Sequence, residues 1–329
     1  MDVKYRSIHL LALVVLLTVA SGAHCPQTLW YQQRPPAPVV FRNEPTLADV
    51  VAVVNANRSL AMSLYANRVT ISGGGVPAMN ATMAIGSPRQ VRLRAGTAIT
   101  GQELDLGSND QEFWIWIKRS QPPSLMVGRH DALAASPLGR TFPIRPEWLV
   151  EAIGLVYLDP QAPHIGPIRR PDGKLEIHTP VTNPAGQTTK VLVLDGRSGL
   201  IYEQHLLDER GQRMASAQNT RHFRDPLTGI ILPRETTLTW TAMAMSLKVE
   251  LNDVQVNPLQ ISADQWTKPQ YPGYPEVDVA TLPAFGAPPP GTTTAPLGLP
   301  PGPTAAAPSR RTANARYAPP AVQPLWPFK

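Results

Sequence analysis

Hydrophobic residues near the start of the folded region recur with the period of an α-helix. Four of them share one helical face: Leu47, Val50, Val51 and Val54. This i, i+3, i+4, i+7 spacing is typical of an amphipathic helix that packs on a core. Thr46 stands before them as an N-cap, and Asp49 follows it by three residues in an acidic version of the capping box. The pattern predicts a helix over 46–57.

Beyond residue 60 the apolar residues alternate with polar ones, which predicts β-strands. The clearest strand is 113–118, where Phe113, Ile115 and Ile117 share one face. Trp114 and Trp116 occupy the other face. A strand that is apolar on both faces is expected to be covered on both. The other predicted strands are 60–72, 78–85, 90–97, 125–129, 174–178, 190–194, 200–207, 213–223, 230–241 and 244–256.

A second helix is predicted over 146–154. Pro146 suits the first turn, because its missing N–H would have no helical partner there. The apolar face of this helix comprises Trp148, Leu149, Ala152 and Ile153. Roughly ten antiparallel strands and two helices predict an α+β fold. We expect one strongly bent antiparallel sheet, an incomplete half-barrel, closed by two or more short helices.

The first residues have the pattern of an export signal. Lys4 and Arg6 precede the apolar stretch 8–20, and small residues follow at 21–23, so 1–23 is predicted to be a signal peptide. The only cysteine of the chain, Cys25, comes two residues later. This position predicts lipidation of the thiol, although His24 stands where a lipoprotein usually has a small residue. The alternative is an exported protein without a lipid anchor.

The distribution of proline predicts how the rest of the chain is divided. The tail 281–329 holds 13 of the 37 prolines, a composition typical of disordered sequence. We therefore expect a Pro-rich spacer over 24–44, a folded domain over 45–270, and a disordered Pro-rich tail over 271–329. A single cysteine excludes a disulfide scaffold within one chain.

Charge and motifs exclude several classes of function. Of the net charge of +6, the tail contributes four, from Arg310, Arg311, Arg316 and Lys329, so the core is nearly neutral and nucleic-acid binding is not expected. We find no nucleophile elbow, phosphate loop, dinucleotide fingerprint or metal-ligand spacing, so we expect no catalytic residues, metal or cofactor. His130-Asp131 reads as a polar strand end, and Asp105 reads as part of a solvated turn.

Large apolar residues provide the candidates for a binding cavity. Trp114, Trp116 and Trp148 are core residues by their type, yet they could also enclose an apolar slot between sheet and helix. Met243 and Met245 alternate on one predicted strand, and methionine adapts to varied apolar ligands. The complete candidate set is Trp114, Trp116, Trp148, Ile153, Met243 and Met245.

The order of these elements resembles the LolA/LolB-like lipoprotein carrier superfamily, over about residues 44–270. The resemblance lies in the helix 46–57 after an export signal, the hairpins, the mid-chain helix and the closing strand 247–258 that leads to Trp266. The segments 99–110, 113–116 and 129–131 are similar to a bacterial lipoprotein branch of unassigned function. The resemblance implies an open half-barrel whose apolar cavity takes acyl chains.

Two functions therefore stay open at this stage. The first is an exported, membrane-anchored, non-enzymatic protein of the cell envelope that holds or transfers lipid or lipoprotein acyl chains. The second is an envelope scaffold lipoprotein with a filled core, whose Pro-rich tail binds a protein partner.

Overall fold

The computed structural model describes residues 37–73, 76–86, 89–136, 145–183 and 186–282. The chain divides into two units, Met1–Pro38 and Val39–Lys329, and the fold described here belongs to the second. The predicted signal peptide, Cys25, most of the spacer and residues 283–329 lie outside the described residues. The predictions about them stay predictions.

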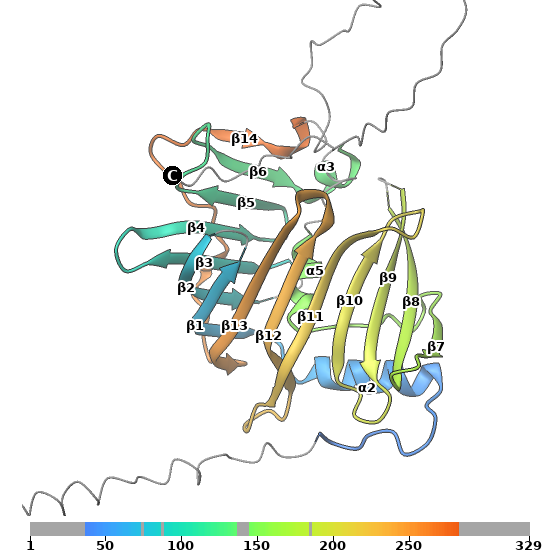
Figure 1. Ribbon diagram of the computed structural model, residues 1–329. Coiled ribbons are helices and arrows are strands. Elements are labelled where there is room, and N and C mark those ends of the chain that lie inside the picture. Colours follow the sequence, from blue (N-terminus) through green and yellow to red (C-terminus); the bar gives the residue numbers. More distant parts are fainter. Residues whose placement is uncertain (1–36, 74–75, 87–88, 137–144, 184–185, 283–329) are drawn as a thin grey trace, which may run out of the picture. The chain divides into compact units, whose positions relative to one another are not determined.

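Fourteen strands of the described chain form one sheet, in the order β14-β6-β5-β4-β3-β2-β1-β13-β12-β11-β10-β9-β8-β7 (Figure 1). Neighbours in the sheet are consecutive in the chain except at two places, where β13 returns to pair with β1 and β14 returns to pair with β6. The strands are β1 (Leu64–Gly73), β2 (Val76–Ile85), β3 (Val91–Thr97), β4 (Gly101–Ser108), β5 (Glu112–Ile117), β6 (Leu125–Arg129), β7 (Ile165–Arg169), β8 (Lys174–Asn183), β9 (Gly186–Asp195), β10 (Ile201–Leu207), β11 (Arg213–Arg224), β12 (Ile231–Trp240), β13 (Met245–Val256) and β14 (Glu276–Asp278).

The sheet is strongly curled but does not close into a barrel. Every strand pair is antiparallel except β14 with β6, and β7 and β14 form the two ends of the strand order. Within the described residues the helices are few and short, which confirms the predicted α+β class with an incomplete half-barrel. They are α2 (Leu47–Ser59), α3 (His130–Ala135), α5 (Pro146–Ala152) and the 3₁₀ turns η2 (Thr241–Met243), η3 (Ala263–Trp266) and η4 (Val279–Thr281).

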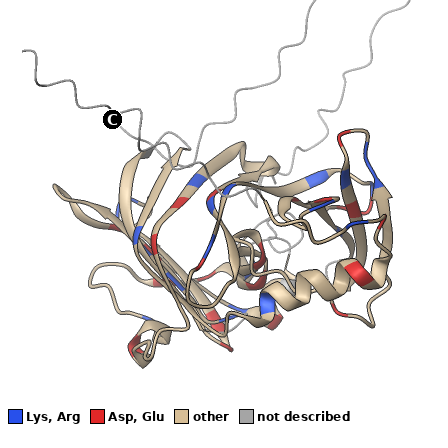
Figure 2. Ribbon diagram, turned by 90° about the horizontal axis from the view of Figure 1, so that it is seen from below, with Lys and Arg blue, Asp and Glu red and all other residues tan. Residues whose placement is uncertain are grey.

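The predicted N-terminal helix is confirmed as α2, including its cap. The Thr46 hydroxyl accepts from the Asp49 N–H at 3.2 Å, and the Asp49 carboxylate accepts from the Thr46 N–H at 2.9 Å. This reciprocal pair satisfies two N–H groups that the first turn would otherwise leave open. Figure 2 shows α2 from below with acidic and basic residues at its two ends, where Asp49 and Arg58 favour the helix dipole.

Both helical faces that the sequence identified are buried against one side of the sheet, which we call the inner face. Val50, Val51 and Val54 of α2 pack with Ile177 of β8 and Leu194 of β9. Trp148, Val150 and Ala152 of α5 join the largest apolar cluster, together with the buried side chains of β1, β2, β11, β12 and β13. None of the described helices is both long and apolar enough to span a membrane.

The sequence missed or misplaced several elements. β4, β7 and β14 were not predicted, and Asp105 of β4 was expected in a solvated turn. His130 begins α3 instead of ending a strand. β14 pairs with β6 beyond residue 270, where we expected the domain to end. Ordered structure therefore continues into the first part of the segment that we expected to be a disordered tail.

Buried His205 and half-buried His222 predict how the fold responds to acid. Burial lowers the pKa of His205, helped by nearby Arg213 and opposed by Glu203, and burial lowers the pKa of His222. Below the ordinary value of 6.5 the unfolded chain takes up protons that the folded chain does not. The free energy of unfolding should therefore decrease as the pH falls from 7 toward 5, until the lowered pKa values are passed.

Urea unfolding at a series of pH values checks this expectation. The double variant His205→Gln with His222→Gln should show a weaker loss of stability between pH 7 and pH 5 than the parent chain. An equal pH dependence in both proteins would contradict the assignment to these two residues.

Candidate functional site

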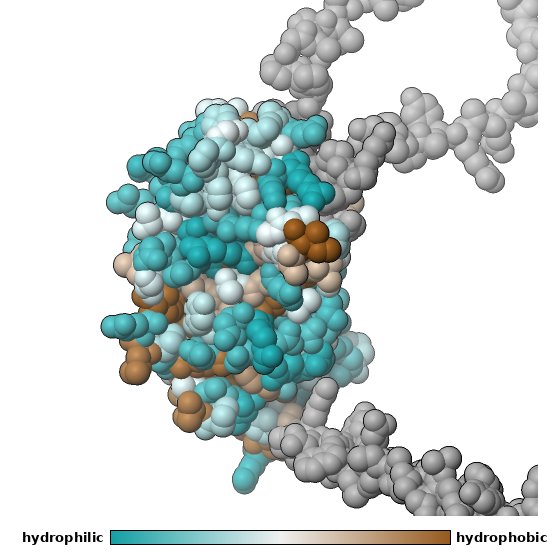
Figure 3. All heavy atoms as spheres, turned by 90° about the vertical axis from the view of Figure 1, so that its left-hand side faces the viewer, coloured by the Kyte–Doolittle hydropathy of each residue, from teal (hydrophilic) through white to brown (hydrophobic). Residues whose placement is uncertain are grey.

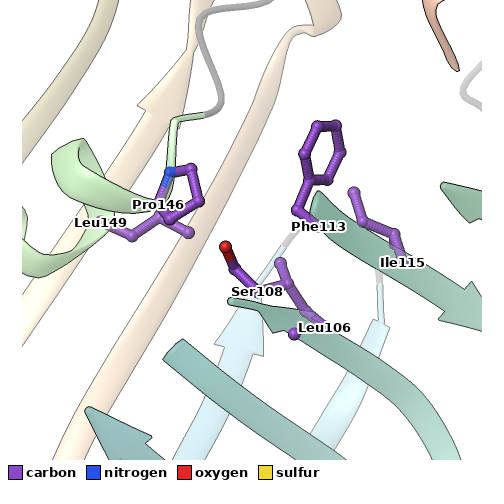
Figure 4. A pocket seen from close by; sticks show the side chains of 7 residues that line it. Leu106, Ser108, Phe113, Ile115, Pro146 and Leu149 are labelled. Carbon is purple, nitrogen blue, oxygen red and sulfur yellow. The ribbon is translucent and has the colours of Figure 1, made fainter. Parts of the chain in front are cut away.

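A small apolar pocket lies on the inner face between the sheet and α5 (Figure 4). Leu106 and Ser108 enter it from β4, and Phe113 and Ile115 enter it from β5. Pro146 and Leu149 of α5 face these strands across the pocket. The lining is completed by Gly107.

Strand register explains why these side chains meet. Ser108 pairs with Phe113 and Leu106 pairs with Ile115, so all four side chains point to the same face of the sheet. Pro146 occupies the first turn of α5, as the sequence predicted, and Leu149 follows it by three residues on the same helical side. The pocket is thus formed by two adjacent strands and one turn of helix.

The pocket alone is smaller than an ordinary ligand site. The space that its lining encloses is only about 10 Å³, and the wider hollow of about 230 Å³ includes open solvent. Small-molecule pockets typically have roughly 300–1,000 Å³. Ser108 supplies the one side-chain hydroxyl of the lining, so the chemistry of this space favours an aliphatic group over a polar ligand.

The inner face continues the pocket as a strip of half-buried apolar side chains. Leu104 of β4 pairs with Ile117 of β5, and Leu93 of β3 pairs with Leu106. At the far end of the strands lie further partly buried residues that pack on the main cluster: Met79, Met214, Met243, Met245 and Leu247. Methionine is flexible and polarisable, so such a surface adapts to apolar chains of different shape.

The structure brings four of the six predicted cavity residues into the same cluster. Trp148 meets Trp240 edge to face, with ring centroids 6.0 Å apart, and Ile153 is buried beside them. Met243 and Met245 pack against this cluster. They do not alternate on one strand as predicted, because Met243 ends η2 and left-handed Ala244 separates it from β13. None of the six lines the pocket itself.

Trp114 and Trp116 lie on the opposite, outer face of the sheet. There they form a separate cluster with Leu125, Tyr271 and Tyr274. The Trp116 and Tyr271 rings are stacked, with centroids 4.1 Å apart and planes 7° from parallel. Trp114 is fully buried over Gly107, where even a Cβ atom would collide with its indole. These two tryptophans fix the C-terminal segment to the sheet and do not contribute to the inner face.

A buried ion pair strengthens the same attachment. Arg92 Nη2 lies 2.6 Å from Asp105 Oδ2, and both side chains are almost fully buried. The Arg92 guanidinium also donates to the carbonyl of Thr267 at 2.9 Å, and the Tyr271 hydroxyl donates to Asp105 at 2.5 Å. Burial, together with the Asp105 carboxylate, raises the pKa of Tyr271, so this hydroxyl stays a donor.

This network corrects the interpretation of Asp105 as part of a solvated turn. Asp105 lies in β4, between Leu104 and Leu106, whose side chains point to the inner face. The alternation of apolar and other residues over 104–107 is typical of a strand. What the sequence could not show is that residues 265–271 return to cover it, because that contact joins segments far apart in the chain.

The contact between Ser108 and His130 does not form a nucleophile with its base. Ser108 Oγ lies 3.4 Å from His130 Nε2, but this nitrogen is 2.8 Å from the Asn109 carbonyl. An Nε2–H that donates to this carbonyl cannot accept the proton of Ser108, and the Ser108 hydroxyl donates to the same carbonyl at 3.3 Å. The two side chains cap the end of β4.

No protein-family model and no curated protein matches the sequence. The structure, by contrast, is similar to an outer membrane lipoprotein-sorting protein domain from Vibrio parahaemolyticus, at 8% identity over 65% of this chain and 95% of that one, with a TM-score of 0.45. A LolA superfamily protein from Nitrosomonas europaea is 8% identical over 68% and 98%, with a TM-score of 0.43. A DUF1329 family protein from Desulfovibrio piger is 11% identical over 68% and 98%, with a TM-score of 0.42.

The similarity to LolA-like structures is one of fold. It agrees with the resemblance that the order of helices and hairpins predicted from the sequence. At these identities and TM-scores it says nothing about what this chain binds.

The buried pair predicts a large cost when one charge is removed. Asp105→Asn leaves Arg92 charged and buried without its counter-ion, which should lower the free energy of unfolding by about 3–5 kcal/mol. The matched control is Asp131→Asn, because Asp131 pairs with Arg129 where both side chains are 70% exposed, and this change should be nearly neutral. Urea unfolding compares the two, and equal effects would contradict the proposed strength of the buried pair.

Proposed function

We propose that this protein is an exported, non-enzymatic component of the cell envelope that holds or transfers lipid or lipoprotein acyl chains on its inner face. The observation that carries the proposal is the strip of half-buried apolar side chains between β3–β5 and α5. Leu93, Leu104 and Leu149 pack at the edge of the main apolar cluster and stay partly exposed, so they leave apolar surface in contact with water. Each CH₂ group that leaves water for this surface contributes about 0.8 kcal/mol.

The strip also explains why a small pocket can serve a long ligand. The pocket between Ser108 and Leu149 is continuous, through the strand register, with Leu93 and Leu104. An extended acyl chain can lie along this line with one end in the pocket. In this arrangement Trp148, Ile153, Met243 and Met245 bound the inner face, while Trp114 and Trp116 support it from behind.

The predicted export signal and the position of Cys25 support a location in the cell envelope. Acylation of Cys25 would anchor it, because more than one acyl chain makes membrane attachment stable. The Pro-rich tail provides a segment for a protein partner, since such sequences favour the extended polyproline helix.

A second function is favoured by the size of the pocket. With about 230 Å³ that includes open solvent, the inner face could be closed in the cell, as in an envelope scaffold that acts through its tail. The two functions differ in whether an acyl chain binds to the purified protein.

Titration with a fluorescent fatty acid separates them. The parent chain should bind the probe, and Leu149→Trp should weaken binding at least tenfold, because the larger side chain fills the pocket. The matched control Ile168→Trp, at the exposed edge strand β7, should bind like the parent. A folded parent protein that binds no probe would overturn the carrier proposal in favour of the scaffold, and equal loss in both variants would overturn the assignment to this pocket.

A further inference from the structure

Four exposed aliphatic side chains lie at one end of the sheet. Leu60 and Met62 precede β1, Leu227 lies in the turn from β11 to β12, and Leu259 follows β13. Since β11, β12, β13 and β1 are consecutive neighbours in the sheet, these segments meet at the same end. We call this group the apolar rim, and Figure 3 shows hydrophobic side chains along the lower margin of this part of the molecule.

The rim is held out to solvent by a rigid turn. The Asp225 carboxylate accepts from the Thr228 N–H at 2.8 Å and from its hydroxyl at 2.7 Å. A backbone hydrogen bond closes the same turn, because the Asp225 N–H donates to the Ile230 carbonyl at 2.8 Å. With these bonds made, Leu227 at the tip is 92% exposed. A flexible loop could fold back and bury this side chain, whereas the hydrogen-bonded turn keeps it exposed.

A second clamp presents the other rim residues. Asn257, in a left-handed conformation, accepts from the Met62 N–H at 2.7 Å and donates to the Leu60 carbonyl at 2.8 Å. Met62 is 77% exposed and Leu259 is fully exposed. Asn57 joins α2 to the Ile231 backbone by two hydrogen bonds of 2.8 and 3.0 Å. These bonds hold the Asp225 turn and the segment around Asn257 in fixed positions relative to α2.

The described chain also begins at this end of the sheet. The N–H groups of Val40 and Phe41 donate to the Arg197 carbonyl in the turn between β9 and β10, which lies at the same strand ends as the rim. Val39 and Val40 are themselves exposed. The stretch from Cys25 to Val39 reaches at most roughly 50 Å when extended. A lipid on Cys25 would thus be connected to the fold at the end that carries the rim.

We propose that the apolar rim contacts the surface of a lipid bilayer. Rigidly displayed aliphatic tips suit insertion at the boundary between headgroups and acyl chains, where buried apolar area drives binding. Arg224, exposed beside the turn and bonded to the Gly229 carbonyl at 3.0 Å, adds a positive charge for anionic headgroups. The inference does not need an acyl-chain site on the inner face, and shares with the proposed function only the exported location.

Vesicle co-sedimentation tests the rim directly. The exported full chain carrying Cys25→Ser, which removes any acyl anchor, is mixed with vesicles of phosphatidylethanolamine and phosphatidylglycerol. The double change Leu227→Asp and Leu259→Asp should reduce the bound fraction at least tenfold. The matched control is Ile99→Asp, which changes a residue 95% exposed in the turn between β3 and β4, at the opposite end of the sheet. It should bind like the parent.

The proposal would be overturned if the parent chain did not sediment with vesicles, or if the Ile99→Asp control lost vesicle binding as strongly as the rim variant. It would also be overturned if the rim formed the contact between two copies of the chain. Gel filtration would then show a dimer of the parent chain and a monomer of the rim variant. Titration of the rim variant with the fluorescent fatty acid keeps the two proposals separate. Unchanged probe binding together with lost vesicle binding supports the rim and leaves the inner face unaffected.

Discussion

A strand that is apolar on both faces has to be covered on both, and β5 imposes this requirement on the sheet. Its Trp114 and Trp116 are buried on the outer face by Tyr271 and Tyr274, while Phe113 and Ile115 face inward toward α3 and α5. Covering the outer face takes the returning C-terminal segment, which the Arg92–Asp105 pair ties down. On the inner side, α3, α5 and Val279 cover Phe113, while Ile115 and Leu106 stay only half covered.

This division gives the two faces different roles. The outer face is closed by stacked rings and a buried ion pair, and such groups are costly to separate once they are paired. The inner face has mostly aliphatic and thioether groups, which bind without fixed geometry and can repack around a guest. A curled but unclosed sheet therefore gains its rigidity on one side and keeps its adaptability on the other.

The sequence predicted what depends on local patterns. The cap of α2 by Thr46 and Asp49, the start of α5 at Pro146 and the two faces of β5 follow from neighbouring residues, and the structure has them. The sequence did not predict the contacts between segments that lie far apart in the chain. Trp114 and Trp116 resembled cavity residues because nothing near them in the chain shows that Tyr271 covers them, and Asp105 looked solvated because its partners are Arg92 and Tyr271.

The proposed function requires that an acyl chain binds to the inner face of the sheet. Crosslinking with a photoreactive fatty acid, followed by mass spectrometry of the labelled peptides, tests this most directly. We expect the label on the segments that carry Leu104–Ile117 and Pro146–Leu149. Label confined to the outer face around Trp116 and Tyr271, or to no defined segment of the folded protein, would contradict it.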